Sequence, residues 1–279
     1  MTAWETHGLH VRVLGPLEAV VHGRAVDLGG PQPRGVLARL AAAPGRTVSV
    51  GTLVDELWGP RPPRDAHRTV RTYVSRLRAA LRLVGGADAA TALVTRAPGY
   101  ELHVHPACID AGRFEHLVAS GQQALAAQPR ISFEHLTQAL GLWRGDAFAE
   151  FGHLPGIAAA AVQLERRRLS ATEARIESAL ALGLDTQAAA ELEMLVQAHP
   201  TRELLWGQLM IALYRLGRQA DALGAYRTAS VLLREEHGIE PSPALAGVHS
   251  RILRHDPALG CAERFPLPRV AVHAAPASW

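Results

Sequence analysis

The sequence predicts a mainly α-helical protein with a small amount of β-structure: an N-terminal winged helix-turn-helix followed by an all-α, tetratricopeptide-like domain. Three observations support this fold class. The 279-residue chain is rich in alanine, the residue that costs least in a helix, and only 5% of its residues are aromatic. A basic helical pattern near residue 70 is followed by a hairpin pattern. The second half contains a 34-residue repeat.

The first third of the chain reads as short strands and helices. Residues 11–28 alternate β-rich runs with Gly-Pro and His-Gly breaks, which is typical of a small antiparallel meander. Residues 33–43 have the spacing of an amphipathic helix, which a Pro-Gly pair ends. A brief strand at Val48 and Val50 leads to a second helix, for which Thr52 is the expected N-cap.

The helix predicted over residues 66–82 carries the most information. Its apolar residues fall on one stripe, namely Val70, Val74, Leu77 and Leu81. The opposite face holds only cationic and hydroxyl side chains: Arg68, Arg71, Thr72, Ser75, Arg78 and Arg82, with Thr69 and Arg76 on its flank and Tyr73 at the core boundary. An ordinary surface helix mixes Glu with Arg to form i,i+4 pairs. The acid-free face therefore favours contact with phosphates and bases over a solvated surface.

Charge follows the same division. Residues 1–105 hold 13 Arg and 8 acids, a net +5, whereas residues 106–279 hold 16 Arg and 18 acids, a net −2.

A Gly-Gly-Ala-Asp linker is expected after the basic helix, and a hairpin after that linker, with Pro98 and Gly99 in a type II turn and Arg96 near its tip. In the last strand Glu101 should face outward. Such a domain places its third helix in the major groove and its hairpin tip against phosphates or an adjacent minor groove.

The second half reads as a stack of helices. Asp110 is the expected cap of a helix ending near residue 127, and helices over 132–143 and 157–182 follow. The pair Leu182-Gly183 recurs 34 residues later as Leu216-Gly217, which is typical of tetratricopeptide units. A generic pair of helical hairpins is the alternative. The predicted domains are a DNA-binding domain over 1–105, a helical domain over 106–259 and a flexible tail over 260–279.

Several classes of function are not supported by the sequence. It has no apolar run that could span a membrane, no secretory signal at its start and no GxSxG, HExxH, CxxC or GxGxxG motif. We therefore expect a cytoplasmic, nucleoid-associated protein that is not an enzyme, with no catalytic residue, no cofactor and no metal site. The nearest approach to a ligand cluster is His103, His105 and Cys108, which lack an evident fourth ligand. The run Arg166-Arg167-Arg168 is interpreted as a solvated face or as ion pairs between domains.

Eleven short stretches, in order along residues 11–259, resemble one family. They are VLGPLEA, LGGPQPRGVLARL, LVDELWG, YVSRLRAALR, RAPGYEL, DAGRF, ALGLWRG, LERRRL, ALYRLGRQADALGAYRTAS, HGIEPSPAL and ILRHDPAL. The chain resembles the Streptomyces antibiotic regulatory protein (SARP) family of transcriptional activators. The resemblance implies an OmpR-type winged helix joined to a bacterial transcriptional activation domain. It also implies binding to promoter direct repeats as a homodimer, recruitment of the RNA polymerase holoenzyme and control of an antibiotic gene cluster.

The resemblance also implies site residues. With the helical pattern, it gives these DNA-contacting positions: Arg68, Thr69, Arg71, Thr72, Tyr73, Ser75, Arg76, Arg78, and in the wing Arg96 and Tyr100. The loop between the second and third helices would contact the polymerase: Gly59, Pro60, Arg61, Pro62, Pro63, Arg64 and Asp65. Residues 128–131 depart from the family pattern and leave the adjoining helix boundaries open.

We expect no receiver or ATPase module in this chain. Two other functions stay open from the residues alone. One is an interaction adaptor that binds a peptide through the helical half, and the other, with little in the sequence to support it, is an enzyme.

Overall fold

A computed structural model describes residues 8–260, so residues 1–7 and the predicted tail beyond Gly260 lie outside the described residues. The chain divides into two compact units that alternate along the sequence. The first holds the chain up to Val118 together with Gln138–Leu169. The second holds Ala119–Thr137 and the helices from Ser170 onward. The first unit therefore includes more of the chain than residues 1–105.

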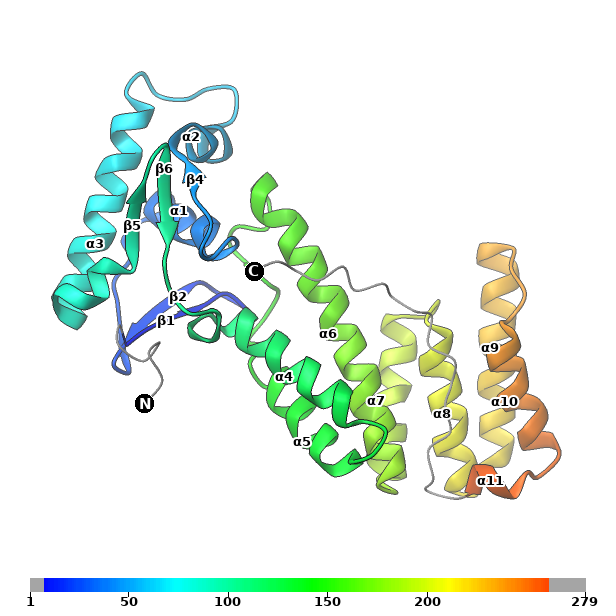
Figure 1. The fold of residues 1–279 in the computed structure, drawn as a ribbon. Helices are drawn as coiled ribbons and strands as arrows, with labels where there is room; N and C mark the ends of the chain where they lie inside the picture. Colours follow the sequence, from blue (N-terminus) through cyan, green and yellow to red (C-terminus); the bar gives the residue numbers. More distant parts are fainter. Residues whose placement is uncertain (1–7, 261–279) are drawn as a thin grey trace. The chain divides into compact units, whose positions relative to one another are not determined.

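Two small antiparallel sheets belong to the first unit (Figure 1). The predicted meander is confirmed as a sheet of order β1-β2-β3, and the second sheet has the order β4-β6-β5. The strands are β1 (Leu9–Arg12), β2 (Glu18–Val21), β3 (Arg24–Ala25), β4 (Val48–Ser49), β5 (Leu93–Arg96) and β6 (Gly99–Leu102). The last two strands form the wing hairpin, and β5 lies beside the third helix.

Three helices pack between these strands: α1 (Pro31–Ala41), α2 (Val50–Trp58) and α3 (Ala66–Thr91). The apolar stripe predicted for the basic helix is confirmed, since its four residues are at most 1% exposed. α3 packs against α1 and α2, whose apolar residues are equally buried, namely Val36, Leu37, Leu40 and Leu53. This apolar core fixes which face of α3 is left to solvent.

Two helices begin differently from the prediction. α1 starts at Pro31 rather than at Pro33, because proline fits the first helical position, where its missing N–H costs no hydrogen bond. The N-cap of α2 is Ser49 rather than Thr52, and the Ser49 Oγ accepts the Thr52 N–H at 3.0 Å. Val50 therefore begins the helix instead of extending the strand.

The linker expected after the basic helix is wrong, because α3 continues to Thr91 with a break at Gly86. Gly86 has φ +74°, a conformation that favours glycine. Gly85 packs so closely on β2 that a Cβ there would lie 2.2 Å from the Val21 Cγ1. The two glycines thus turn the helix end against the sheet rather than releasing it into a linker.

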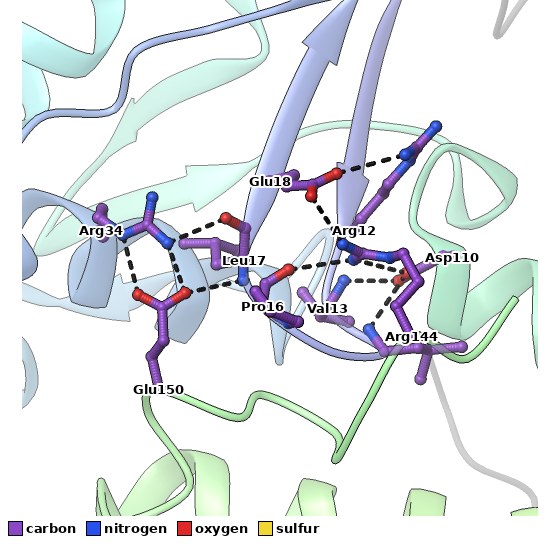
Figure 2. Close-up of polar contacts among 10 residues, drawn as sticks. Arg12, Val13, Pro16, Leu17, Glu18, Arg34, Asp110, Arg144 and Glu150 are labelled. Carbon is purple, nitrogen blue, oxygen red and sulfur yellow. Dashed lines mark hydrogen bonds and ion pairs between the residues drawn. The ribbon is translucent and has the colours of Figure 1, made fainter.

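Carboxylates from later in the chain hold the turn between β1 and β2 (Figure 2). Asp110, the first residue of α4 (Asp110–Ala124), accepts the N–H of Val13 at 2.7 Å and of Leu14 at 3.1 Å. Asp110 was expected to cap its own helix from the position before it, whereas it is the first helical residue and its carboxylate binds the turn after β1. Burial raises the pKa of the Asp110 carboxyl, although its hydrogen bonds with these backbone amides oppose the shift.

The segment that follows α5 (Pro129–Leu140) also binds this turn. Arg144 pairs with Glu18 at 2.9 Å and donates to the Pro16 carbonyl at 3.0 Å. Glu150 accepts the Leu17 N–H at 3.0 Å and pairs with Arg34. These contacts explain why residues well beyond 105 belong to the first unit.

The arginine run in α6 (Pro155–Ala181) forms ion pairs inside the first unit. Arg167 pairs with Glu115, and Arg168 lies 3.6 Å from Glu165 with its guanidinium 4.6 Å from the Trp143 ring centroid. Arg166 is exposed. Two of the three charges are thus neutralised locally, and the run is not a second basic patch.

The second unit contains the predicted repeat. Its helices after α6 are α7 (Asp185–Ala198), α8 (Glu203–Arg215), α9 (Gln219–His237), α10 (Pro243–Leu253) and the short α11 (Pro257–Gly260). Gly183 and Gly217, 34 residues apart, have φ of +73° and +74°. At both turns the next N–H reaches back five residues, from Leu184 to Ala179 and from Arg218 to Leu213. This hydrogen bond and the left-handed glycine are those of a Schellman motif at a helix C-terminus. The sequence repeat is therefore also a repeat in backbone geometry.

Candidate nucleic-acid interface

The exposed face of α3 is cationic. Arg68, Arg71, Thr72, Ser75, Arg76 and Arg82 are all exposed, and Thr69 is half-buried. Among residues 8–260, none of these four arginines pairs with a carboxylate. The Thr69 and Thr72 hydroxyls donate to the Asp65 and Arg68 carbonyls one turn back, while their oxygens keep acceptor capacity. The face therefore presents unneutralised positive charge and small polar groups.

Tyr73 lies where the helical pattern places it, at the edge of the core. It is half-buried, and its ring stacks on Trp58 of α2 with centroids 6.3 Å apart. The aromatic pair connects α3 to the end of α2. This placement favours a packing role for the ring and leaves the hydroxyl as the group that could meet a phosphate.

The wing hairpin turns differently from the prediction. The type II turn is wrong: the Ala97–Pro98 peptide bond is cis, and Pro98 takes the third position of the turn, as in type VI turns. Gly99 is required by crowding rather than by a positive φ, since a Cβ there would lie 1.8 Å from the Val48 carbonyl oxygen. Arg96 is exposed beside this turn, at the end of β5.

The alternation expected for the last strand is also wrong, because both faces of β6 are buried. Glu101 is only 8% exposed as a residue. Its carboxylate hydrogen-bonds with the His103 Nδ1 at 2.8 Å and lies 3.9 Å from the Arg96 guanidinium. An acid therefore sits beside the wing's exposed cation.

Arg78 and Tyr100 meet where α3 contacts the wing. Arg78 is half-buried, and it donates from Nε to the Leu93 carbonyl at 2.9 Å and from Nη2 to the Thr95 hydroxyl at 2.8 Å. Tyr100 is 7% exposed as a residue, and its ring centroid lies 5.8 Å from the guanidinium carbon. Both residues were expected to contact DNA, and the structure instead engages their side chains within the protein.

Thr95 was missed by reasoning from the sequence, although a signal was present. A two-residue turn at 97–98 pairs residue 96 with 99 and residue 95 with 100, as observed. Thr95 therefore lies directly across from Tyr100 on the same face of the hairpin. That pairing, combined with the position of Arg78 on the neighbouring helix, would have indicated their contact.

The remaining candidate residues are those of the 59–65 loop and the sequence-predicted trio His103, His105 and Cys108. All seven residues of the 59–65 loop are exposed, including Arg61 and Arg64. Within the described range, no group of three or more His, Cys, Asp or Glu residues could hold a metal ion. Cys108 is buried, and burial raises the pKa of its thiol. No helix in the described range has the length and apolar character needed to cross a bilayer.

Two family models match the chain in the order of its fold. The model described as "Transcriptional regulatory protein, C terminal" matches residues 23–102, and "Bacterial transcriptional activator domain" matches residues 109–253. The regulatory protein DnrI of Streptomyces peucetius is 38% identical over 256 residues, which cover 90% of this chain and 94% of DnrI. The chain belongs to the Streptomyces antibiotic regulatory protein family. Members of this family are transcriptional regulators.

Other SARP-family relatives are longer. The regulatory protein AfsR of Streptomyces griseus is 40% identical over 263 residues, covering 93% of this chain but 26% of AfsR. A solved structure of Mycobacterium tuberculosis EmbR in complex with a low-affinity phosphopeptide has a TM-score of 0.82 and 37% identity, and the match covers 89% of this chain and 65% of EmbR. The chain thus spans about a quarter of AfsR and less than two thirds of EmbR.

Proposed function

We propose that this chain is a sequence-specific DNA-binding activator that switches on a secondary-metabolite gene cluster. It acts as a homodimer on direct repeats in promoters and recruits the RNA polymerase holoenzyme. The observation that carries the proposal is the exposed face of α3 over residues 66–82, which has no acid and holds four arginines that pair with no carboxylate in the described part of the chain. Membership of a family of transcriptional regulators supports it, as do family relatives named for regulation, such as DnrI.

The surface suits both parts of DNA recognition. The arginines neutralise phosphates and release counterions, which supplies affinity that does not depend on sequence. Thr72, Ser75 and Arg76 lie on the face that would enter the major groove, where hydroxyls and guanidinium groups contact base edges. An Arg bidentate to guanine contributes about 1–3 kcal/mol of discrimination against a wrong base. Arg96 anchors the wing on the phosphate backbone.

Substitution of Arg76 on α3 and of Arg96 in the wing tests the proposed DNA binding. Arg76→Ala and Arg96→Ala should each weaken binding to a promoter fragment and lower the slope of log K against log salt by about 1. Arg130→Ala is the matched control, since Arg130 is an exposed arginine of α5 with an 84% exposed side chain. Equal affinity and slope for all four proteins would refute this assignment of contacts.

Substitutions in the 59–65 loop test the proposed recruitment of RNA polymerase separately. Its exposed arginines belong to the loop before α3 and not to the helix, so Arg61→Ala with Arg64→Ala should retain most promoter binding and lose activation in a purified transcription assay. An adaptor that bound only peptides would show neither DNA binding nor activation. Loop variants that activate fully would rule out this loop as the polymerase contact.

A further inference from the structure

We propose that Arg78 is a positioning residue: it fixes the wing hairpin against α3 so that Arg96 meets the DNA backbone, and it does not itself contact bases. The inference rests on the proposed DNA binding, and it assigns Arg78 a role distinct from that of the exposed arginines beside it.

The contacts of Arg78 differ from those of its neighbours on α3. Its Nε and Nη2 groups donate to the Leu93 carbonyl at 2.9 Å and to the Thr95 hydroxyl at 2.8 Å, both on β5. Arg76 and Arg82 are exposed, and no carboxylate in the described range pairs with them. A guanidinium is planar with donors in fixed directions, so two bonds to one strand fix its orientation.

The ring of Tyr100 completes the contact from the second wing strand. Its centroid lies 5.8 Å from the Arg78 guanidinium carbon, within the range of a cation–π interaction, and Tyr100 as a whole is 7% exposed. Tyr100 pairs across the hairpin with Thr95 and across the sheet with Val48 of β4. One side chain of α3 therefore touches both strands of the wing, and one of these strands is anchored in the sheet.

The position of this contact explains why it matters for Arg96. Thr95 precedes Arg96 directly in β5, and Arg96 pairs in register with Gly99 across the turn. A two-stranded hairpin is marginal by itself, and β5 is an edge strand of its sheet. Bonds from a helix to Leu93 and Thr95 hold this edge next to the residue that would reach the phosphate.

Two variants test the contact without reference to DNA. In hydrogen exchange on the full chain, Arg78→Ala should increase exchange of the β5 and β6 amides by about tenfold, since local opening becomes easier. Thr95→Val removes one of the two bonds and should give a smaller increase in the same amides. Arg82→Ala is the control and should leave them unchanged. If the wing amides of Arg78→Ala exchange at the wild-type rate, the proposal is overturned, whatever the DNA-binding measurement shows.

A double-mutant cycle then tests the consequence for DNA. Arg78→Ala alone should lower promoter affinity by about tenfold. In an Arg96→Ala background the same substitution should lower it by less than about twofold, because the wing then carries no cation whose position Arg78 could fix. Arg82→Ala should be additive with Arg96→Ala. Full additivity for Arg78 would show an independent DNA contact and overturn its positioning role. A wild-type protein that does not bind promoter DNA would instead refute the proposed function. The hydrogen-exchange experiment would still test whether Arg78 holds the wing.

Discussion

At the scale of single residues, similar side chains have different surroundings and therefore different roles. Arg76 is solvated, Arg78 is bonded to the wing, and Arg96 lies 3.9 Å from a carboxylate. The helical pattern predicted which arginines leave the core of α3. It could not predict which of them the wing would engage, because that depends on a pairing between segments that are distant in sequence.

Glu101 gives a prediction at this scale. Its carboxylate lies beside Arg96 and would face the phosphates that Arg96 binds. Glu101→Gln removes that charge, so we expect promoter affinity to rise by about two- to fivefold at low salt, because the exposed Arg96 is partly screened from the carboxylate by solvent. Fluorescence anisotropy with a labelled promoter fragment measures the change, with Glu134→Gln on α5 as control. Weaker binding by the variant would show that the carboxylate supports the wing rather than opposing DNA.

Asp110 gives a prediction about pH. Burial raises the pKa of its carboxyl above the ordinary 3.8, so the folded protein holds this proton more tightly than the unfolded chain does. Its contribution to the free energy of unfolding is therefore largest below pH 3.8 and declines as the pH rises through the folded-state pKa. Urea unfolding of the wild type and Asp110→Asn at a series of pH values measures the difference. The wild type should lose stability relative to the variant over that window, and a relative gain would contradict this account.

At the scale of elements, periodicity predicted the helices well and the turns poorly. The buried stripe of α3 follows from its 3.6-residue spacing alone. The wing turn does not, because Pro98 and Gly99 suit a type II turn by composition. The observed turn has a cis Ala97–Pro98 bond, and Gly99 lies too close to Val48 of the neighbouring strand for a Cβ, a contact that the local sequence does not indicate.

A glycine of the repeated turns and a glycine inside a helix give a matched pair of substitutions. Gly217 has φ +74°, so Gly217→Ala should cost about 1 kcal/mol of stability. Gly247 lies inside α10, has open space where a Cβ would be placed, and has no positive φ. Gly247→Ala should therefore stabilise by about 0.5–1 kcal/mol. Thermal unfolding of both variants measures the two signs, and equal effects would contradict the role assigned to the turn.

At the scale of the whole molecule, the sequence predicted the family, the fold class and the order of the parts. The meander, the helices and the hairpin could be placed from local patterns. The contribution of residues 138–169 to the first unit could not, because it depends on Arg144, Glu150 and Phe148 reaching a turn more than a hundred residues earlier.

This division predicts a difference between fragments. A fragment of residues 1–105 lacks Asp110, Arg144 and Glu150, so the amides of Val13, Leu14 and Leu17 lose their carboxylate acceptors. We expect it to unfold at a lower temperature than a fragment of residues 1–169, by several degrees or more. Differential scanning calorimetry compares the two. Equal melting temperatures would show that the later segment is not needed for the first unit.

Footprinting of the purified full chain on the promoters beside its own gene shows whether the protein binds repeated promoter sites through α3. If the α3 face and the wing bind promoter DNA, the wild type should protect repeated sites in the same orientation, and Arg76→Ala should need markedly more protein for the same protection. Absence of protection by the folded wild type at low salt, or identical protection by Arg76→Ala, would contradict the account.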